Sequence, residues 1–180
     1  MLRHIISLKS ELHSKQHTYL LVLAIIFGCL IGTVFAFVQC RADMIALPSL
    51  PSLCVYFSSR SVLNILTVCC LFSLLLLLAG CTGFRLLSFG ILFFLKGFSA
   101  AFLIFVFAFF YHSQGIVIAA AALLFHSFLL LPLQMVSAVS LMLERQPAKS
   151  KFAALSAINA AAAFACFLCE RYLLPSLIYI

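Results

Sequence analysis

Acidic residues and tryptophan are the scarcest components of this chain of 180 residues. Asp and Glu number four together against eleven Lys and Arg, and Trp is absent. The four acids lie at or beyond the ends of the long apolar segments: Glu11, Asp43, Glu144 and Glu170. A proton or ion path that depends on carboxylates inside a membrane therefore cannot be built from this sequence. Without Trp, any aromatic belt at a membrane surface must consist of Tyr and Phe.

Motifs of known catalytic chemistry are missing as well. The sequence holds no GxSxG, no HExxH, no phosphate-binding Gly-rich loop and no pair of aspartates within an apolar segment. Its basic residues are spread over separate segments between the apolar runs, which argues against a nucleic-acid surface. We therefore expect a protein that is not an enzyme, requires no cofactor or metal and does not bind nucleic acid.

Apolar residues dominate what is present. Of the chain, 66% is hydrophobic and 8% is charged, and the mean hydropathy is +1.27. Such a composition excludes a soluble domain with a polar surface and indicates a polytopic membrane protein. A helix of about 20 apolar residues crosses a hydrocarbon core of about 30 Å. Five segments qualify: 18–38, 61–79, 86–110, 116–143 and 152–174.

These segments predict an all-α fold, because no strand-like alternation accompanies them. We expect a bundle of five transmembrane helices that forms one domain over residues 18–180, preceded by a basic cytoplasmic segment, residues 1–17. The third and fourth spans are separated by a predicted turn at 111–115. Because the fourth segment has 28 residues and includes Pro132, we expect it to tilt or to break into two pieces.

The distribution of Lys and Arg predicts the orientation of the bundle. With the amino terminus inside, the cytoplasmic side holds seven basic residues: Arg3, Lys9, Lys15, Arg85, Arg145, Lys149 and Lys151. The outer side holds three: Arg41, Arg60 and Arg171. An excess of basic residues on the inside is the usual arrangement, so the chain is expected to run N-in and C-out.

Lys96 is the only charged residue between Leu86 and Leu143. A cation at that depth costs about 2.5 to 3.5 kcal/mol on insertion scales, so it must reach water, find a partner or serve a function. Three successive spans offer polar groups near the same depth, which predicts a midplane cluster of Lys96, His126, Ser127 and Asn159. The cluster is open to three interpretations: hydrogen bonds between helices, an ion or substrate path, or contact with a span of a partner.

Small residues at one-turn spacing mark two spans as helix-packing faces. Gly28 and Gly32 form a GxxxG in the first span, and Gly97 and Ala101 repeat the spacing in the third. Such residues let two helix backbones approach closely in lipid. They either pack the bundle of the chain itself or bind a partner.

The eight Cys residues permit one predicted disulfide. Cys40 and Cys54 both fall in the segment expected outside, where a bond between them would close a loop of about 15 residues. A thiol oxidoreductase would need a second reactive pair at the outer face, and the outer turn at 111–115 has no Cys. Redox chemistry is therefore the weaker interpretation of these cysteines.

The residues around Lys96 also carry a family resemblance. The string Phe94-Leu95-Lys96-Gly97-Phe98 follows a short Gly turn at 80–83, and Gly115 precedes an apolar segment that contains Pro132. This order, together with the glycines of the first span, resembles the stage II sporulation protein M family, whose members show a similar FLKGF or FLRGF string at the start of a Gly-rich third span. The chain departs from the family pattern at Phe125-His126-Ser127, where a Pro-x-Asn is typical.

The resemblance implies a non-catalytic scaffold in the cell membrane of endospore-forming bacteria. Its implied partners are membrane-anchored peptidoglycan hydrolases, the stage II sporulation proteins D and P, during septal remodelling in engulfment. A second hypothesis is a small transporter, or the substrate-binding subunit of one, with a midplane site beside Pro132.

Overall fold

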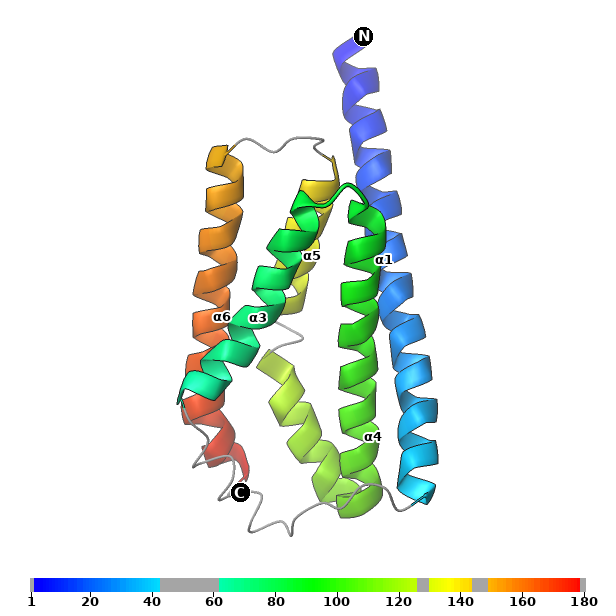
Figure 1. Ribbon diagram of the computed structural model, residues 1–180, viewed down its shortest axis with the longest axis vertical. Helices are drawn as coiled ribbons and strands as arrows, with labels where there is room; N and C mark the ends of the chain where they lie inside the picture. The colour runs from blue at the N-terminus through cyan, green and yellow to red at the C-terminus, as the bar shows by residue number, and fades with distance from the viewer. Residues whose placement is uncertain (1, 43–61, 126–129, 144–148, 179–180) are drawn as a thin grey trace.

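The structure is a computed structural model, and it describes residues 2–42, 62–125, 130–143 and 149–178. Over these residues the chain is helical apart from short turns, which confirms the predicted all-α fold. The helices are α1 (Leu2–Arg41), α3 (Val62–Cys81), α4 (Arg85–Phe125), α5 (Leu131–Leu143) and α6 (Lys149–Ile178) (Figure 1).

Three helices contain stretches that are long and apolar enough to cross a membrane: Ser14–Arg41 in α1, Arg85–Val117 in α4 and Ser150–Leu168 in α6. They include most of the predicted spans 18–38, 86–110 and 152–174. In an apolar window of 18 residues within each stretch, only 22%, 28% and 22% of the residues are buried, so most side chains there are at least partly exposed, where lipid would solvate them. Within the described residues, α3 and α5 contribute shorter apolar stretches, Leu71–Cys81 and Leu131–Leu143.

The chain reverses direction inside α4, at His112. This residue has a non-helical φ of 51° and ψ of −129°, which divides the element into two arms, residues 85–111 and 113–125. In Figure 1 the first arm descends beside α1 and the second rises again. The turn predicted at 111–115 lies at this reversal.

The fourth predicted span, 116–143, contains two helices in the structure. One ends at Phe125, and α5 begins at Leu131 with Pro132 in its first turn, where a missing backbone N–H costs no helical hydrogen bond. Both pieces rise in the same direction in Figure 1. Residues 126–129, which join the two pieces, lie outside the described part of the chain, so the expected tilt or break of this segment stays a prediction.

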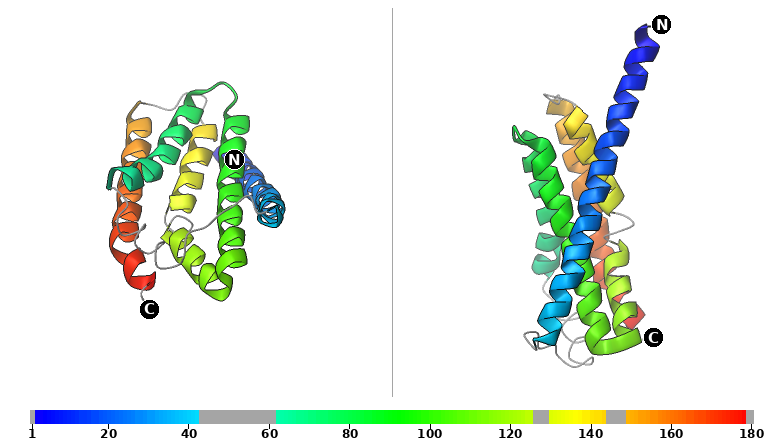
Figure 2. Two further views of the ribbon diagram at one scale, coloured as in Figure 1. Left: turned by 60° about the horizontal axis from the view of Figure 1, so that its bottom comes forward. Right: turned by 90° about the vertical axis from the view of Figure 1, so that its right-hand side faces the viewer.

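Helices α1 and α4 form the most extensive contact between two helices, and α3 makes its largest contact with α6. In Figure 1, α1 and α6 lie at opposite edges, with α3 and α5 between them. The amino-terminal part of α1 projects beyond the other helices, as the right-hand view of Figure 2 shows. α1 begins at one end of the molecule and α6 ends at the other, as an odd number of crossings would require.

The core lies where four helices meet. It contains Leu21 of α1, Leu76 of α3, Phe89 and Phe93 of α4, and Leu141 of α5, each at most 1% exposed. Since these helices are far apart in the sequence, the cluster fixes their relative positions and, with them, the polar side chains that lie beside it.

Candidate functional site

Lys96 has a defined set of partners within the bundle. Its Nζ donates a hydrogen bond to Gln134 Oε1 over 2.6 Å, and the same nitrogen lies 4.4 Å from the centroid of the Phe72 ring. A cation over an aromatic face is attracted by the ring quadrupole, and the attraction grows where water is excluded. The ammonium of α4 is therefore held between a neutral amide of α5 and an aromatic ring of α3.

Gln134 extends this contact to a third helix. Its side chain is fully buried, at 0% exposed, and its Nε2 donates to Ser73 Oγ of α3 over 3.1 Å. The amide thus accepts from Lys96 and donates to Ser73, which gives both of its ends a partner. A buried amide that is satisfied at both ends holds α3, α4 and α5 in one arrangement, because loss of either bond leaves a polar group unpaired.

A further hydrogen bond joins α6 to α5 one turn further along. Asn159 Nδ2 donates to Ser137 Oγ over 2.8 Å and to Leu155 O of its own helix over 2.9 Å. Asn159 and Ser137 are 1% and 0% exposed. Since Gln134 and Ser137 are three residues apart on α5, they lie on the same face of that helix. Helix α5 is thereby bonded to α3, α4 and α6 through neighbouring side chains.

The structure describes two members of the predicted midplane cluster. Lys96 and Asn159 both reach the same face of α5, whereas His126 and Ser127 lie outside the described residues. Gln134, Ser137 and Ser73, which complete the network, are absent from the predicted cluster. One sequence feature could have identified Gln134 as part of this network: it is an amide in an apolar stretch, two residues after Pro132, and a buried amide there needs a polar partner.

The glycines predicted as packing faces hold α1 and α4 together. A Cβ atom placed on Gly28 would come within 2.9 Å of Phe98 N, one on Gly32 within 3.0 Å of Phe98 Cα, and one on Gly97 within 3.0 Å of the Ile25 carbonyl carbon. Real Cβ atoms are not found so close to backbone atoms, so each position requires glycine for this approach. Of the two interpretations of these faces, the structure shows packing within the chain itself.

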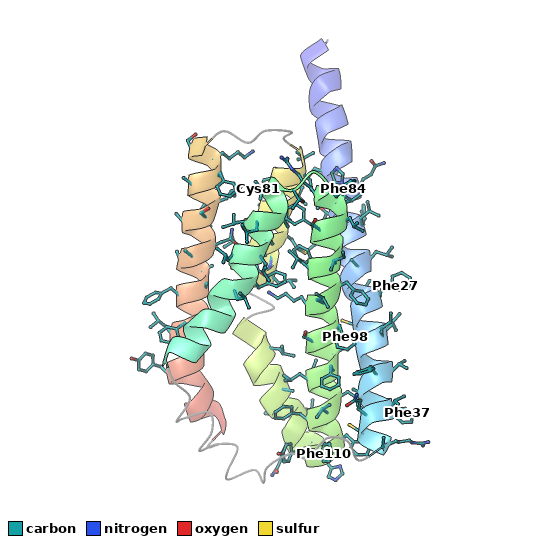
Figure 3. The ribbon with its side chains drawn as sticks, viewed as in Figure 1. Phe27, Phe37, Cys81, Phe84, Phe98 and Phe110 are labelled. Atoms are coloured by element: carbon teal, nitrogen blue, oxygen red, sulfur yellow. The ribbon has the colours of Figure 1, made fainter. Side chains whose placement is uncertain are left out.

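Around this contact the interface is filled by Phe side chains. Phe98, labelled in Figure 3 between α4 and α1, lies 5.7 Å from Phe35 and stacks on Phe102 at 6.1 Å between ring centroids. Cys29 Sγ donates to Gly97 O over 3.4 Å beside it. Ala101, predicted to pack with Gly97, is half-buried one turn further along α4.

Arg85 ties the beginning of α4 to the end of α5. Its Nη1 donates to Leu141 O over 2.8 Å, and a cation is favoured beside the free carbonyls at a helix carboxyl end. Arg85 belongs to the predicted inner group of basic residues, so this contact lies at the end of the bundle expected to face the cytoplasm.

Cys40 lies at the other end of α1. It is 1% exposed and packs with Ala36 and Val106. Its predicted disulfide partner, Cys54, lies outside the described residues, so the pairing stays a prediction.

Together the fold and the site define an all-helical protein with helices apolar enough to cross a membrane, whose polar side chains bond to one another across four helices. Within the described part of the chain, no group of three or more His, Cys, Asp or Glu side chains is placed to hold a metal ion. No family model, curated protein or solved structure matches the chain.

Proposed function

We propose that the protein is a non-catalytic scaffold of the bacterial cell membrane, which crosses the membrane five times with its amino terminus inside. The observation that carries this proposal is the bonding of Lys96, the one cation at mid-depth, to Gln134 and through it to Ser73. A lysine in such a set of bonds locks helices together, which is the property that a rigid docking frame requires.

In this proposal the five crossings are distributed over the five helices as follows. Helices α1, α3, α4 and α6 supply four of them, the first arm of α4 counting as the third span, and the second arm of α4 together with α5 supplies the remaining one. The seven basic residues assigned to the inner side favour the N-in, C-out orientation.

The proposed binding partners of the scaffold are membrane-anchored peptidoglycan hydrolases of the stage II sporulation protein D and P type. The support for this part is the resemblance of the segment around Phe94-Leu95-Lys96-Gly97-Phe98 to the stage II sporulation protein M family. In this proposal the chain assembles the hydrolases at the septum during engulfment, and other membrane proteins and the lipid bilayer are its surroundings.

The proposal is tested by crosslinking in native membranes. The tagged protein is expressed with the membrane-anchored hydrolases of its own genome, crosslinked, solubilised in detergent and analysed by mass spectrometry. We expect crosslinks to the hydrolases, and their loss when the span of a hydrolase is replaced by an unrelated transmembrane helix. Recovery of the protein alone from cells that contain the hydrolases would contradict the proposal.

A transporter is the second candidate, because one observation favours it. Pro132 lies two residues before Gln134 and thus close to Lys96, and helices interrupted by Pro or Gly frame the binding sites of many transporters. This candidate predicts uptake into proteoliposomes, or stabilisation by a ligand, that disappears in Lys96→Met. A folded Lys96→Met variant with unchanged uptake would remove it.

A further inference from the structure

A groove of about 530 Å³ opens between α3 and α6. Apolar side chains line most of it, among them Leu74 and Leu77 of α3 and Phe152 of α6. In Figure 1 the two helices cross near the start of α3 and diverge towards its end. The groove is not enclosed, so its lining can be reached from outside the bundle.

The α6 side of the groove has small residues at one-turn spacing. Ser156, Ala160 and Ala163 all line it, and positions separated by four and three residues lie on one face of a helix. From Phe152 to Ala163 the groove follows α6 for about 16 Å, which is about three helical turns at 1.5 Å per residue. A face of this length and composition is suited to the close approach of another helix.

One of the residues that line the groove carries a buried acceptor without a donor. This residue, Asn159, is 1% exposed. Both hydrogens of its Nδ2 are used, on Ser137 Oγ and on Leu155 O, while its Oδ1 has no hydrogen-bond partner. Buried amide oxygens are nearly always paired, so a missing donor at this place points to a missing component.

The unpaired oxygen restricts which kind of molecule can be the missing component. An acyl chain of a lipid carries no hydrogen-bond donor and would leave Asn159 Oδ1 unpaired. Ser, Thr, Asn and Gln side chains on a transmembrane helix do carry donors, and they are the usual polar contacts between helices in a membrane.

We infer that the groove between α3 and α6 binds one transmembrane helix of a partner protein. This helix has small residues on its docking face and a hydroxyl or amide side chain that donates to Asn159 Oδ1. The inference rests on the proposed scaffold function and specifies where the partner binds. It places that surface away from the contact between α1 and α4, where the chain itself occupies the face of Gly28 and Gly32.

The test is a pair of matched substitutions on α6. Ala160 and Ala161 are both exposed, but only Ala160 lines the groove. The full chain carrying Ala160→Phe or Ala161→Phe is co-expressed with the membrane-anchored hydrolases, and the retained hydrolase is quantified after solubilisation. We expect Ala160→Phe to reduce retention about tenfold, equivalent to about 1.4 kcal/mol of binding free energy, and Ala161→Phe to leave it within about twofold.

A second set of variants tests the donor. The hydroxyl and amide side chains in the span of the retained hydrolase are replaced by Ala one at a time, and one of these changes is expected to lower retention. No effect from any of them would contradict hydrogen bonding to Asn159.

The remaining outcomes separate this inference from the function on which it rests. Equal retention by the Ala160→Phe and Ala161→Phe variants would overturn the groove as the docking site and leave the scaffold intact. Recovery of the unsubstituted protein without hydrolase would overturn both. Native mass spectra with two copies of this chain, separated by Ala160→Phe, would show that a second copy occupies the groove and so overturn the inferred partner.

Discussion

At the scale of single residues, the decisive feature is the contact of Lys96 with two other helices. Its ammonium donates to Gln134 of α5 and lies over the Phe72 ring of α3. These two contacts compensate part of the cost of placing a charge among apolar helices. The role assigned to Lys96 therefore depends on Gln134.

Removing the acceptor of Lys96 should cost more stability than removing both partners. Gln134→Leu leaves the ammonium and Ser73 without the amide, so we expect a loss of about 1.5 to 3 kcal/mol in the free energy of unfolding. The double variant Lys96→Met with Gln134→Leu replaces both groups by apolar ones and should recover part of this loss. Unfolding in mixed micelles measures the stability of the unsubstituted protein, of the single variants Lys96→Met and Gln134→Leu, and of the double variant. Additive effects of the two substitutions would show that the hydrogen bond contributes no coupling.

At the scale of elements, the contact between α1 and α4 depends on glycines for proximity. Gly28, Gly32 and Gly97 each lie against backbone of the facing helix, whereas a Cβ on Gly90, also in α4, would meet no atom within 4 Å. The chain thus provides a control glycine in one of the same helices, at a position that does not contact α1 backbone.

Substitution of these glycines by Ala should separate into two classes. Gly28→Ala forces α1 and α4 apart, and we expect a destabilisation of about 1 to 3 kcal/mol, typical of overpacking. Gly90→Ala should be neutral or stabilise by up to about 1 kcal/mol, because Ala favours a helix more than Gly. Thermal unfolding in detergent compares the two. Equal effects would mean that the close approach does not support the fold.

The reversal at His112 provides a second test on an element. Its φ of 51° is in the region that favours glycine, and holding another residue there costs of order 1 to 3 kcal/mol. We expect His112→Gly to raise stability by about 1 kcal/mol, while His112→Val lowers it, because a β-branched residue is least tolerant of positive φ. A lower melting temperature for His112→Gly than for the unsubstituted protein would contradict this geometry.

Some features of these elements could be predicted from the sequence alone, and others could not. Apolar length predicted the helices, and the polar run at 111–115 predicted the reversal, because both are local properties. The contact of Gly28 with Phe98 could not be predicted, since the GxxxG pattern identifies a face without identifying its partner. Gln134 was missed for a related reason: the start of α5 at Leu131 sets which side chains of that helix point to Lys96.

At the scale of the whole molecule, the proposed N-in, C-out orientation requires an odd number of crossings. Ala42 directly follows α1, and Ser150 is the second residue of α6. Both residues are exposed, and they lie at opposite ends of the bundle. Single cysteines at these positions, in a background without the native Cys, report their side of the membrane. With an impermeant thiol reagent, Ala42→Cys should react in intact cells and Ser150→Cys only after permeabilisation. Reaction of Ser150→Cys in intact cells would contradict the proposed orientation.

The most direct test of the central claim compares hydrolase retention by the unsubstituted protein and by the folded double variant Lys96→Met with Gln134→Leu. A scaffold uses these residues to hold its own helices, so both proteins should retain membrane-anchored peptidoglycan hydrolase within about threefold of each other, a difference of less than about 1 kcal/mol. Recovery of the unsubstituted protein without hydrolase would contradict the claim, as would complete loss of the hydrolase from a double variant that still folds.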